Sequence, residues 1–170
     1  MNDLDYINSM VWWIKPGQLG GMPMPYFDPE RRLNQIGHLD AFKDDLPLLY
    51  QIGVRSVVCL LNLPKDETIY HQAVFGFHCS YVPDFKAPTM EQMKSIYHFI
   101  KQAPKALVVH CEGGIGRTGT ILAAYLILEG ESCNNAIDMV RKAEPTAIES
   151  QDQFSFLYEC EKRKCEFRHD

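Results

Sequence analysis

A cysteine and an arginine separated by five residues form the most chemically suggestive pattern in this chain. An apolar, β-branched run at residues 106–109 precedes Cys111 and predicts a buried strand, and a helical pattern begins at Arg117. The connecting loop is rich in glycine and lies at the start of a predicted helix, where backbone N–H groups and the helix dipole favour an anion. We expect the loop residues to bind that anion: Glu112, Gly113, Gly114, Ile115, Gly116 and Arg117.

The side chains of Cys111 and Arg117 would turn this anion site into a reaction site. A thiol beside a helix N-terminus and a cation is expected to be a thiolate near neutral pH, and the thiolate is the nucleophilic form of cysteine. A guanidinium group can hold two oxygens of a tetrahedral anion with its planar fork. This combination predicts displacement at phosphorus or sulfur through a covalent cysteinyl intermediate.

The segment from His110 to Gly119, H-C-E-G-G-I-G-R-T-G, resembles the H-C-x-x-G-x-x-R-[ST]-G signature of the protein tyrosine phosphatase superfamily. Residues 12–25 are similar to the W-[VI]-x-P-G-x-L-A-G-x-P opening of the small atypical dual-specificity phosphatases. Residues 82–88, V-P-D-F-K-A-P, resemble the I-P-D-F-x-x-P aspartate loop of the same group. The resemblance extends from Trp12 to about Phe167.

The resemblance implies roles for further residues. Asp84 would be the general acid, Thr118 would donate its hydroxyl to the sulfur, and Gln153 would orient the hydrolytic water, although a purely helix-capping role for Gln153 stays open. His110 would hold the loop through hydrogen bonds, or serve as an ordinary structural histidine. The chain departs from the group's R-x-x-R-P-G-S-I-E pattern, because Glu144 replaces an arginine and Thr146 a glycine.

The elements that must position these residues alternate between strand and helix. Strands are predicted at residues 12–14, 54–61, 77–82 and 106–109, and helices at 39–53, 67–74, 89–103, 117–129, 132–141 and from 150 onward. Residues 15–25 are rich in glycine and proline and predict a surface loop, and a short helical turn is expected at 28–32. This order predicts an α/β fold: a single domain, residues 1–170, with a central, largely parallel twisted sheet flanked by helices. A phosphatase-type phosphate loop would join a central strand to a helix.

Composition restricts the class of protein. The chain of 170 residues has an ordinary hydrophobic content of 46% and lacks an apolar run near the roughly 20 residues of a membrane span. No secretory signal is visible, and the six cysteines do not resemble a disulfide framework, so we expect a cytoplasmic monomer. A net charge of −5 argues against a nucleic-acid partner. The six histidines show no ligand spacing, so neither a metal nor another cofactor is expected.

The expected activity is the metal-independent hydrolysis of phosphomonoesters, with phosphorylated proteins or small phosphomonoesters as partners. The resemblance favours phosphotyrosine together with phosphoserine or phosphothreonine, because the K-N-R-Y element of tyrosine-specific enzymes is missing. The alternative is an inositol-polyphosphate or phosphoinositide phosphatase. A phosphate-recognition module without turnover, or a sulfur transferase, fits the intact set of Cys111, Arg117 and Asp84 less well.

Overall fold

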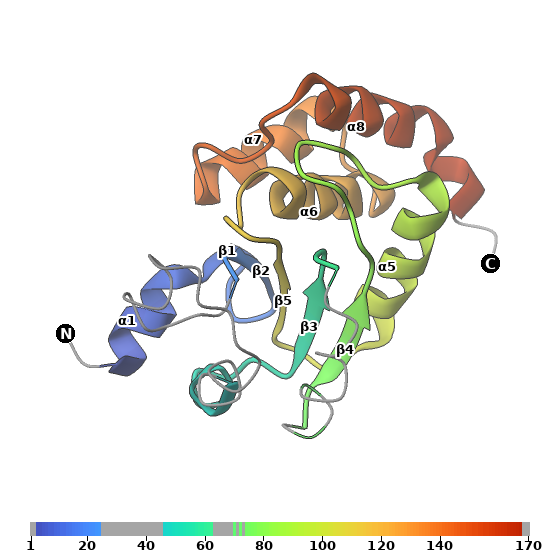
Figure 1. Cartoon of the computed structure of the whole chain (residues 1–170). Coiled ribbons are helices and arrows are strands. Elements are labelled where there is room, and N and C mark those ends of the chain that lie inside the picture. Colours follow the sequence, from blue (N-terminus) through green and yellow to red (C-terminus); the bar gives the residue numbers. More distant parts are fainter. Residues whose placement is uncertain (1–2, 25–45, 63–69, 71, 73, 168–170) are drawn as a thin grey trace.

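A computed structural model describes residues 3–24, 46–62, 70, 72 and 74–167. The described residues form one α/β unit around a five-stranded sheet with the strand order β1-β2-β5-β3-β4 (Figure 1). The strands are β1 (Trp12–Lys15), β2 (Leu19–Met22), β3 (Ser56–Cys59), β4 (Gly76–Cys79) and β5 (Leu107–His110). Strand β1 is antiparallel to β2, and the other neighbours are parallel, which confirms the predicted largely parallel sheet.

The register brings the carboxyl ends of four strands to the same level. Met22 of β2 and Cys59 of β3 both pair with His110, the last residue of β5, and Cys59 also pairs with Cys79 of β4. Ligands of open parallel sheets bind beyond this edge. The cysteine loop leaves the central strand β5 at this edge, as predicted.

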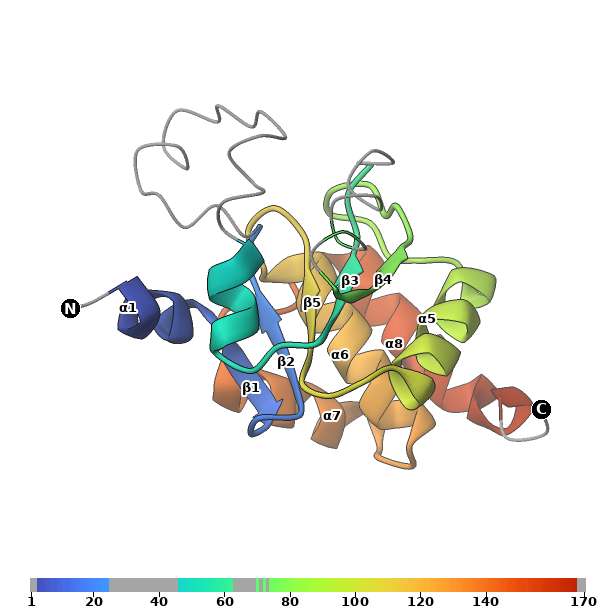
Figure 2. The same cartoon turned by 90° about the horizontal axis from the view of Figure 1, so that it is seen from below.

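Helices cover both faces of the sheet (Figures 1 and 2). The helices are α1 (Asp3–Met10), α5 (Met90–Gln102), α6 (Gly116–Leu128), α7 (Cys133–Ala143) and α8 (Gln151–Arg163), followed by the 3₁₀ turn η1 (Lys164–Phe167). Helices α5 to α8 pack on the face that carries Leu107 and Val109, whereas α1 and the short helix at 46–51 pack on the face that carries Val108. The β5 side chains therefore alternate between two apolar cores, as expected of a central strand covered on both sides.

Local hydrogen bonds set the beginnings of three helices. The Thr89 hydroxyl accepts from the amide of Gln92, and the Gln92 side chain accepts from the amide of Thr89, so α5 begins with the predicted capping box. A second capping box joins Ser150 and Gln153 at the start of α8, and Ser132 caps α7. The spacings of Thr89 and Gln92 and of Ser150 and Gln153 predict the two capping boxes, whereas the sequence left both Ser132 and Asn134 open as the cap of α7.

The prediction of a surface loop at residues 15–25 holds for the exposed turn at 16–18 but is wrong for residues 19–22. Residues 19–22 form β2, a fully buried strand between β1 and β5. The glycines serve close packing here: a Cβ atom on Gly20 would lie 2.9 Å from Cε3 of Trp13, and one on Gly21 would overlap the indole of Trp12. Glycine can indicate a close approach of other atoms to a strand as well as a turn. The loop was predicted because these glycines were interpreted as turn residues.

Two helix predictions fall partly on residues that the structure does not describe. Residues 46–51 of the predicted helix 39–53 are helical, and Gly53 adopts the left-handed φ of 97° expected at a helix end. Tyr70 and Gln72 are helical within the predicted helix 67–74. Residues 52, 53 and 74 form turns and not helix. Residues 39–45, 67–69, 71 and 73, and the turn predicted at residues 28–32, lie outside the described residues.

Candidate active site

The loop between β5 and α6 leaves the start of α6 open to a ligand. Ile115 precedes α6 and provides no side-chain cap, in contrast to the Ser and Thr residues that precede α5, α7 and α8. The first amides of a helix lack intrahelical partners and need an acceptor from outside. Gly114 has a φ of 72°, and a Cβ atom there would overlap the backbone of Met22 and Pro23. Glycine is therefore required on both conformational and steric grounds.

The sulfur of Cys111 lies at the floor of this loop and accepts two hydrogen bonds. The amide of Gly114 and the hydroxyl of Thr118 are both 3.2 Å from Sγ. Thr118 is completely buried in the first turn of α6, and Cys111 is 2% exposed. Two donors and the positive end of a helix dipole stabilise negative charge on the sulfur.

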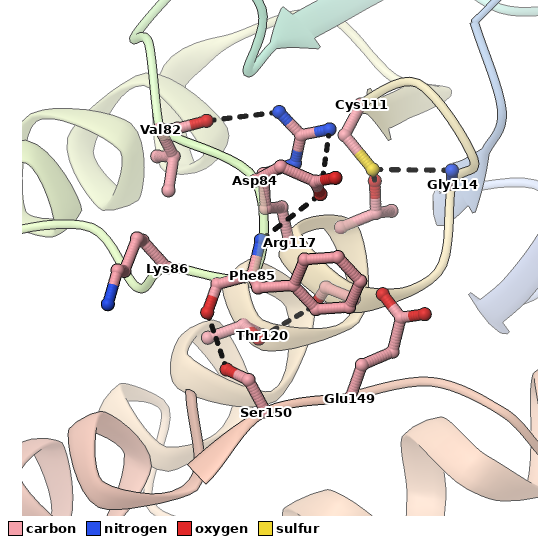
Figure 3. A network of polar contacts seen from close by, with 12 residues as sticks. Val82, Asp84, Phe85, Lys86, Cys111, Gly114, Arg117, Thr120, Glu149 and Ser150 are labelled. Carbon is pink, nitrogen blue, oxygen red and sulfur yellow. Dashed lines mark hydrogen bonds and ion pairs between the residues drawn. The ribbon is translucent and has the colours of Figure 1, made fainter. Parts of the chain in front are cut away.

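Arg117 is held beside the sulfur by the loop that follows β4. Its Nη1 donates to the carbonyl of Val82 at 3.1 Å, and its Nη2 lies 3.3 Å from Oδ1 of Asp84 (Figure 3). The side chain is 7% exposed, yet Nε has no hydrogen-bond partner among the described residues. A buried donor without a partner is costly in a native structure. An oxyanion bound in the loop would supply the missing acceptor.

Asp84 lies at the mouth of the site in a loop that α8 anchors. Its Oδ1 accepts from the amide of Phe85, and its side chain is 66% exposed. Phe85 has a φ of 56°, and its carbonyl accepts a 2.6 Å hydrogen bond from the Ser150 hydroxyl. Lys86 forms an ion pair with Asp152 of α8. These contacts set the position from which Asp84 reaches the site.

Gln153 is completely buried and much of its amide is already engaged. Its Oε1 accepts from the amides of Glu149 and Ser150, and its Nε2 lies 3.4 Å from the carbonyl of Lys86. A Cβ atom on Gly116 would lie 3.2 Å from Nε2. The capping role left open by the sequence is therefore present, and the amide also faces Gly116 at the start of α6.

These residues surround a cavity of about 180 Å³. Its lining consists of Asp84, Phe85, Cys111, Glu112, Gly113, Ile115, Gly116, Arg117 and Glu149. The fold thus brings together Cys111 from the loop after β5, Arg117 from the first turn of α6 and Asp84 from the loop after β4. Gly114, Thr118 and Gln153 stand behind the lining, where they contact Cys111 or Gly116. A thiol, a guanidinium and a carboxylate around one cavity can carry out nucleophilic displacement on a bound oxyanion.

Comparisons with known proteins agree with this geometry. The family model described as "Polymorphic toxin system, DSP-PTPase phosphatase" matches residues 33–131, which is more than half of the chain and includes both site loops. The chain belongs to the DSP-type protein tyrosine phosphatases. This is a family of cysteine-dependent phosphatases, which are phosphoric monoester hydrolases.

Individual relatives support the same family. The chain is 26% identical over 142 residues to the dual specificity protein phosphatase CDC14AB of Danio rerio, covering 83% of this chain and 23% of that protein. It is 42% identical over 90 residues to an uncharacterized protein of Methanocaldococcus jannaschii, covering 49% of this chain and 55% of that protein. The chain thus spans only part of the length of these curated relatives.

Solved structures match nearly the whole chain. The active form of Tk-PTP is 28% identical, has a TM-score of 0.68, and is matched over 91% of this chain and 97% of that one. Kinase-associated phosphatase shares the fold, with a TM-score of 0.72. It is 18% identical and is matched over 91% of this chain and 95% of that one. No helix in the described part of the phosphatase is both long and apolar enough to cross a membrane.

The N-terminal strands of the phosphatase hold the outer side of the cysteine loop. The indole Nε1 of Trp12 donates to the carbonyl of Gly114 at 3.1 Å, and the amide of Met24 donates to the carbonyl of Glu112 at 2.9 Å. Both carbonyls are thereby engaged with residues outside the cavity lining. This arrangement orients the loop so that its amides remain available to the bound anion.

His110 supports the loop from the other face of the sheet. It is completely buried, with Nδ1 3.3 Å from the carbonyl of Cys111 and Nε2 3.1 Å from the hydroxyl of Tyr70. Burial lowers the pKa of His110 to about 4, and the charge of Arg117 adds to this effect, although the hydrogen bond to Cys111 opposes it. The neutral ring can donate from Nδ1 to Cys111 and accept at Nε2 from Tyr70. This geometry fits a supporting role, as the sequence suggested, and not proton transfer.

Four contributors to the site were not predicted from the sequence: Trp12, Tyr70, Phe85 and Glu149. Phe85 could have been suspected because it follows Asp84 directly in a loop. Trp12 and Tyr70 reach the loop from segments that are distant in sequence, and no spacing rule connects them to Cys111. Glu149 lies in the segment between α7 and α8, and its place in the R-x-x-R-P-G-S-I-E pattern does not indicate that its side chain faces the cavity.

Proposed function

We propose that this phosphatase removes phosphate from phosphotyrosine and from phosphoserine or phosphothreonine in proteins. The observation that carries the proposal is the pairing of a hydrogen-bonded sulfur with a buried, unpartnered Nε of Arg117 in one open cavity. The cavity is small, and Phe85, which is 56% exposed, offers an aromatic surface at its wall. Such a wall suits the ring of phosphotyrosine, and the open mouth also accepts shorter phosphorylated side chains.

In the first chemical step, the thiolate of Cys111 attacks phosphorus and the bond from phosphorus to the leaving oxygen breaks. Arg117 and the loop amides of Glu112, Gly113, Ile115 and Gly116 hold the three equatorial oxygens and stabilise their charge, while the amide of Gly114 donates to Cys111. Asp84 transfers its proton to the leaving oxygen, so that a neutral tyrosine, serine or threonine departs. The products of this step are the dephosphorylated residue and a cysteinyl phosphate.

In the second step, water attacks the cysteinyl phosphate and restores the enzyme. Asp84, now a carboxylate, accepts a proton from this water. For Gln153 to orient the water, its amide must turn from the carbonyl of Lys86 toward the cavity. The bond between sulfur and phosphorus breaks, and the hydroxyl of Thr118 stabilises the departing thiolate through its 3.2 Å hydrogen bond. Inorganic phosphate is released, and each step balances in atoms and protons.

The proposal is tested with a panel of phosphotyrosine and phosphothreonine peptides, p-nitrophenyl phosphate and inositol hexakisphosphate. We expect turnover of the aryl phosphate and both peptides, and little turnover of the inositol phosphate. Cys111→Ser should abolish turnover while phosphotyrosine peptide binding remains measurable. Cys165→Ser, at an exposed cysteine in η1, is the matched control and should retain wild-type activity.

Three outcomes would contradict the proposal. Faster hydrolysis of inositol hexakisphosphate than of either peptide would assign the site to inositol polyphosphates. Turnover by Cys111→Ser close to the wild-type rate would exclude the cysteinyl phosphate. Binding of the peptides by the wild-type protein without any turnover would instead indicate a recognition module.

A further inference from the structure

Two carboxylates in the cavity are not used by the proposed mechanism. Glu112 and Glu149 both line the cavity and are exposed, and neither has a hydrogen-bond or ion-pair partner for its side chain among the described residues. Asp84, the third carboxylate of the lining, is paired with Arg117. Unpaired carboxylates beside an anion site oppose the binding of a phosphate, so their presence there needs an explanation.

The position of Glu149 is set by the surrounding fold. Arg141 of α7 donates from Nε to the carbonyl of Ala147 and from Nη2 to the carbonyl of Ile148, each at 3.0 Å. Ile148 is held at a φ of 65°, and the amide of Glu149 donates to Oε1 of Gln153 at 2.8 Å. The backbone on both sides of Glu149 is therefore constrained, and Figure 3 shows the side chain pointing from this segment toward the cysteine loop.

The Glu149 carboxylate lies against the first residue of α6. A Cβ atom on Gly116 would overlap Oε2 of Glu149, so glycine at this position leaves room for the carboxylate. Glu112 reaches the same cavity from the loop itself, directly after Cys111. The two carboxylates thus approach the cavity from different segments.

The charges of the cavity divide into a cationic interior and an anionic surround. Arg117 is buried and keeps an unpartnered Nε, which is available to the phosphate that reacts. Among the described residues, the remaining charged groups of the lining are Asp84, Glu112 and Glu149. Lys86, the cation of the Asp84 loop, is already paired with Asp152. Groups of the substrate beyond the reacting phosphate would therefore meet an excess of negative charge.

We propose that Glu112 and Glu149 make this phosphatase select phosphorylated residues flanked by lysine or arginine. The same carboxylates disfavour substrates that carry a second phosphate close to the first, such as inositol polyphosphates. A second phosphate close to these carboxylates raises the free energy of the enzyme–substrate complex, whereas a lysine or arginine close to them lowers it. This inference rests on the proposed protein substrates, and it names the sequence context that they share.

The test compares two phosphotyrosine peptides of equal length that carry arginine or glutamate on both sides of the phosphotyrosine. For unit charges separated by a few ångströms near a protein surface, we expect kcat/KM to favour the arginine peptide by about tenfold at low salt. The preference should shrink at about 1 M salt, where the Debye length is roughly 3 Å. Glu112→Gln and Glu149→Gln should each reduce the preference by about threefold, and the double variant should nearly abolish it.

The matched control is Glu159→Gln, which removes the same charge from an exposed position on α8 outside the cavity lining. It should retain the full preference. A second pair of substrates, 4-(aminomethyl)phenyl phosphate and 4-carboxyphenyl phosphate, measures charge selectivity without a peptide. The ratio of kcat/KM for the two substrates is measured in the wild type and in the double variant. The two leaving groups differ equally in both proteins, so a change in this ratio reports only the effect of the two carboxylates.

The outcomes separate this inference from the proposed function. If the double variant keeps the wild-type preference in both substrate pairs, or if the wild type shows no preference, the role of Glu112 and Glu149 is refuted. If only the aryl pair is hydrolysed and shows the expected change, the charge selectivity holds but the protein substrates do not. A loss of preference in Glu159→Gln equal to that of the cavity variants would also overturn the assignment.

Discussion

Trp12 offers the sharpest test of how the cysteine loop is held in its reactive conformation. Trp12→Phe keeps an aromatic ring on β1 but removes the indole N–H that donates to the carbonyl of Gly114. Leaving a buried polar group without its partner costs about 1–3 kcal/mol. Part of this cost destabilises the whole fold, and the rest falls on the loop conformation that presents its amides to the phosphate.

We expect the share that falls on the loop to be about 1–1.5 kcal/mol, which corresponds to a roughly tenfold loss of kcat/KM. The affinity for tungstate, an unreactive tetrahedral anion, should fall by a similar factor because the same amides bind it. The measurements are kcat/KM for p-nitrophenyl phosphate, tungstate inhibition at constant pH, and the free energy of unfolding in urea.

Trp13→Phe is the matched control. Trp13 is the next residue on β1 and packs against Gly20, much as Trp12 packs against Gly21, but it borders the core on the other face of the sheet. The two variants lose comparable apolar area, so both should lower the free energy of unfolding, while only Trp12→Phe should lower kcat/KM and tungstate affinity. Equal kinetic losses in both variants, or a Trp12→Phe enzyme with more than half of the wild-type kcat/KM, would refute the reasoning.

Three further predictions concern the reaction and its support. Arg117→Lys keeps the charge but loses the planar fork and its Nε donor, so kcat/KM for p-nitrophenyl phosphate should fall more than tenfold, a loss above about 1.4 kcal/mol. Asp84→Asn should lower kcat about 10²–10⁴-fold for phosphotyrosine and far less for aryl phosphates with strongly acidic phenols; equal dependence of kcat on leaving-group acidity in both proteins would exclude Asp84 as the acid. Because the pKa of His110 is lowered to about 4, its ring should stay neutral in an NMR titration down to about pH 5. As pH falls from 6.5 toward 4, the unfolded chain takes up a proton that the folded protein does not, and stability should drop by about 3 kcal/mol; titration of His110 near pH 6.5 would contradict this.

Features set by neighbouring residues could be predicted from the sequence. The strand, loop and helix around Cys111, and the caps at Thr89 and Ser150, depend on partners within a few positions of one another. The alternation of strand and helix was enough to predict a parallel sheet with the loop at its carboxyl edge. These local patterns were enough to predict most of the fold and the pairing of Cys111 with Arg117 at one site.

Features that depend on packing between distant segments were decided only by the tertiary structure. Strand β2 was mistaken for a loop because its glycines carry no pattern that distinguishes a turn from contact with an indole ring. The hydrogen bond from Trp12 to Gly114 joins residues 102 positions apart. Glu149 enters the cavity because Arg141 holds the preceding carbonyls and Gly116 leaves space for the carboxylate. The direction of a side chain across elements depends on how those elements pack, and residue spacing along the chain does not encode that geometry.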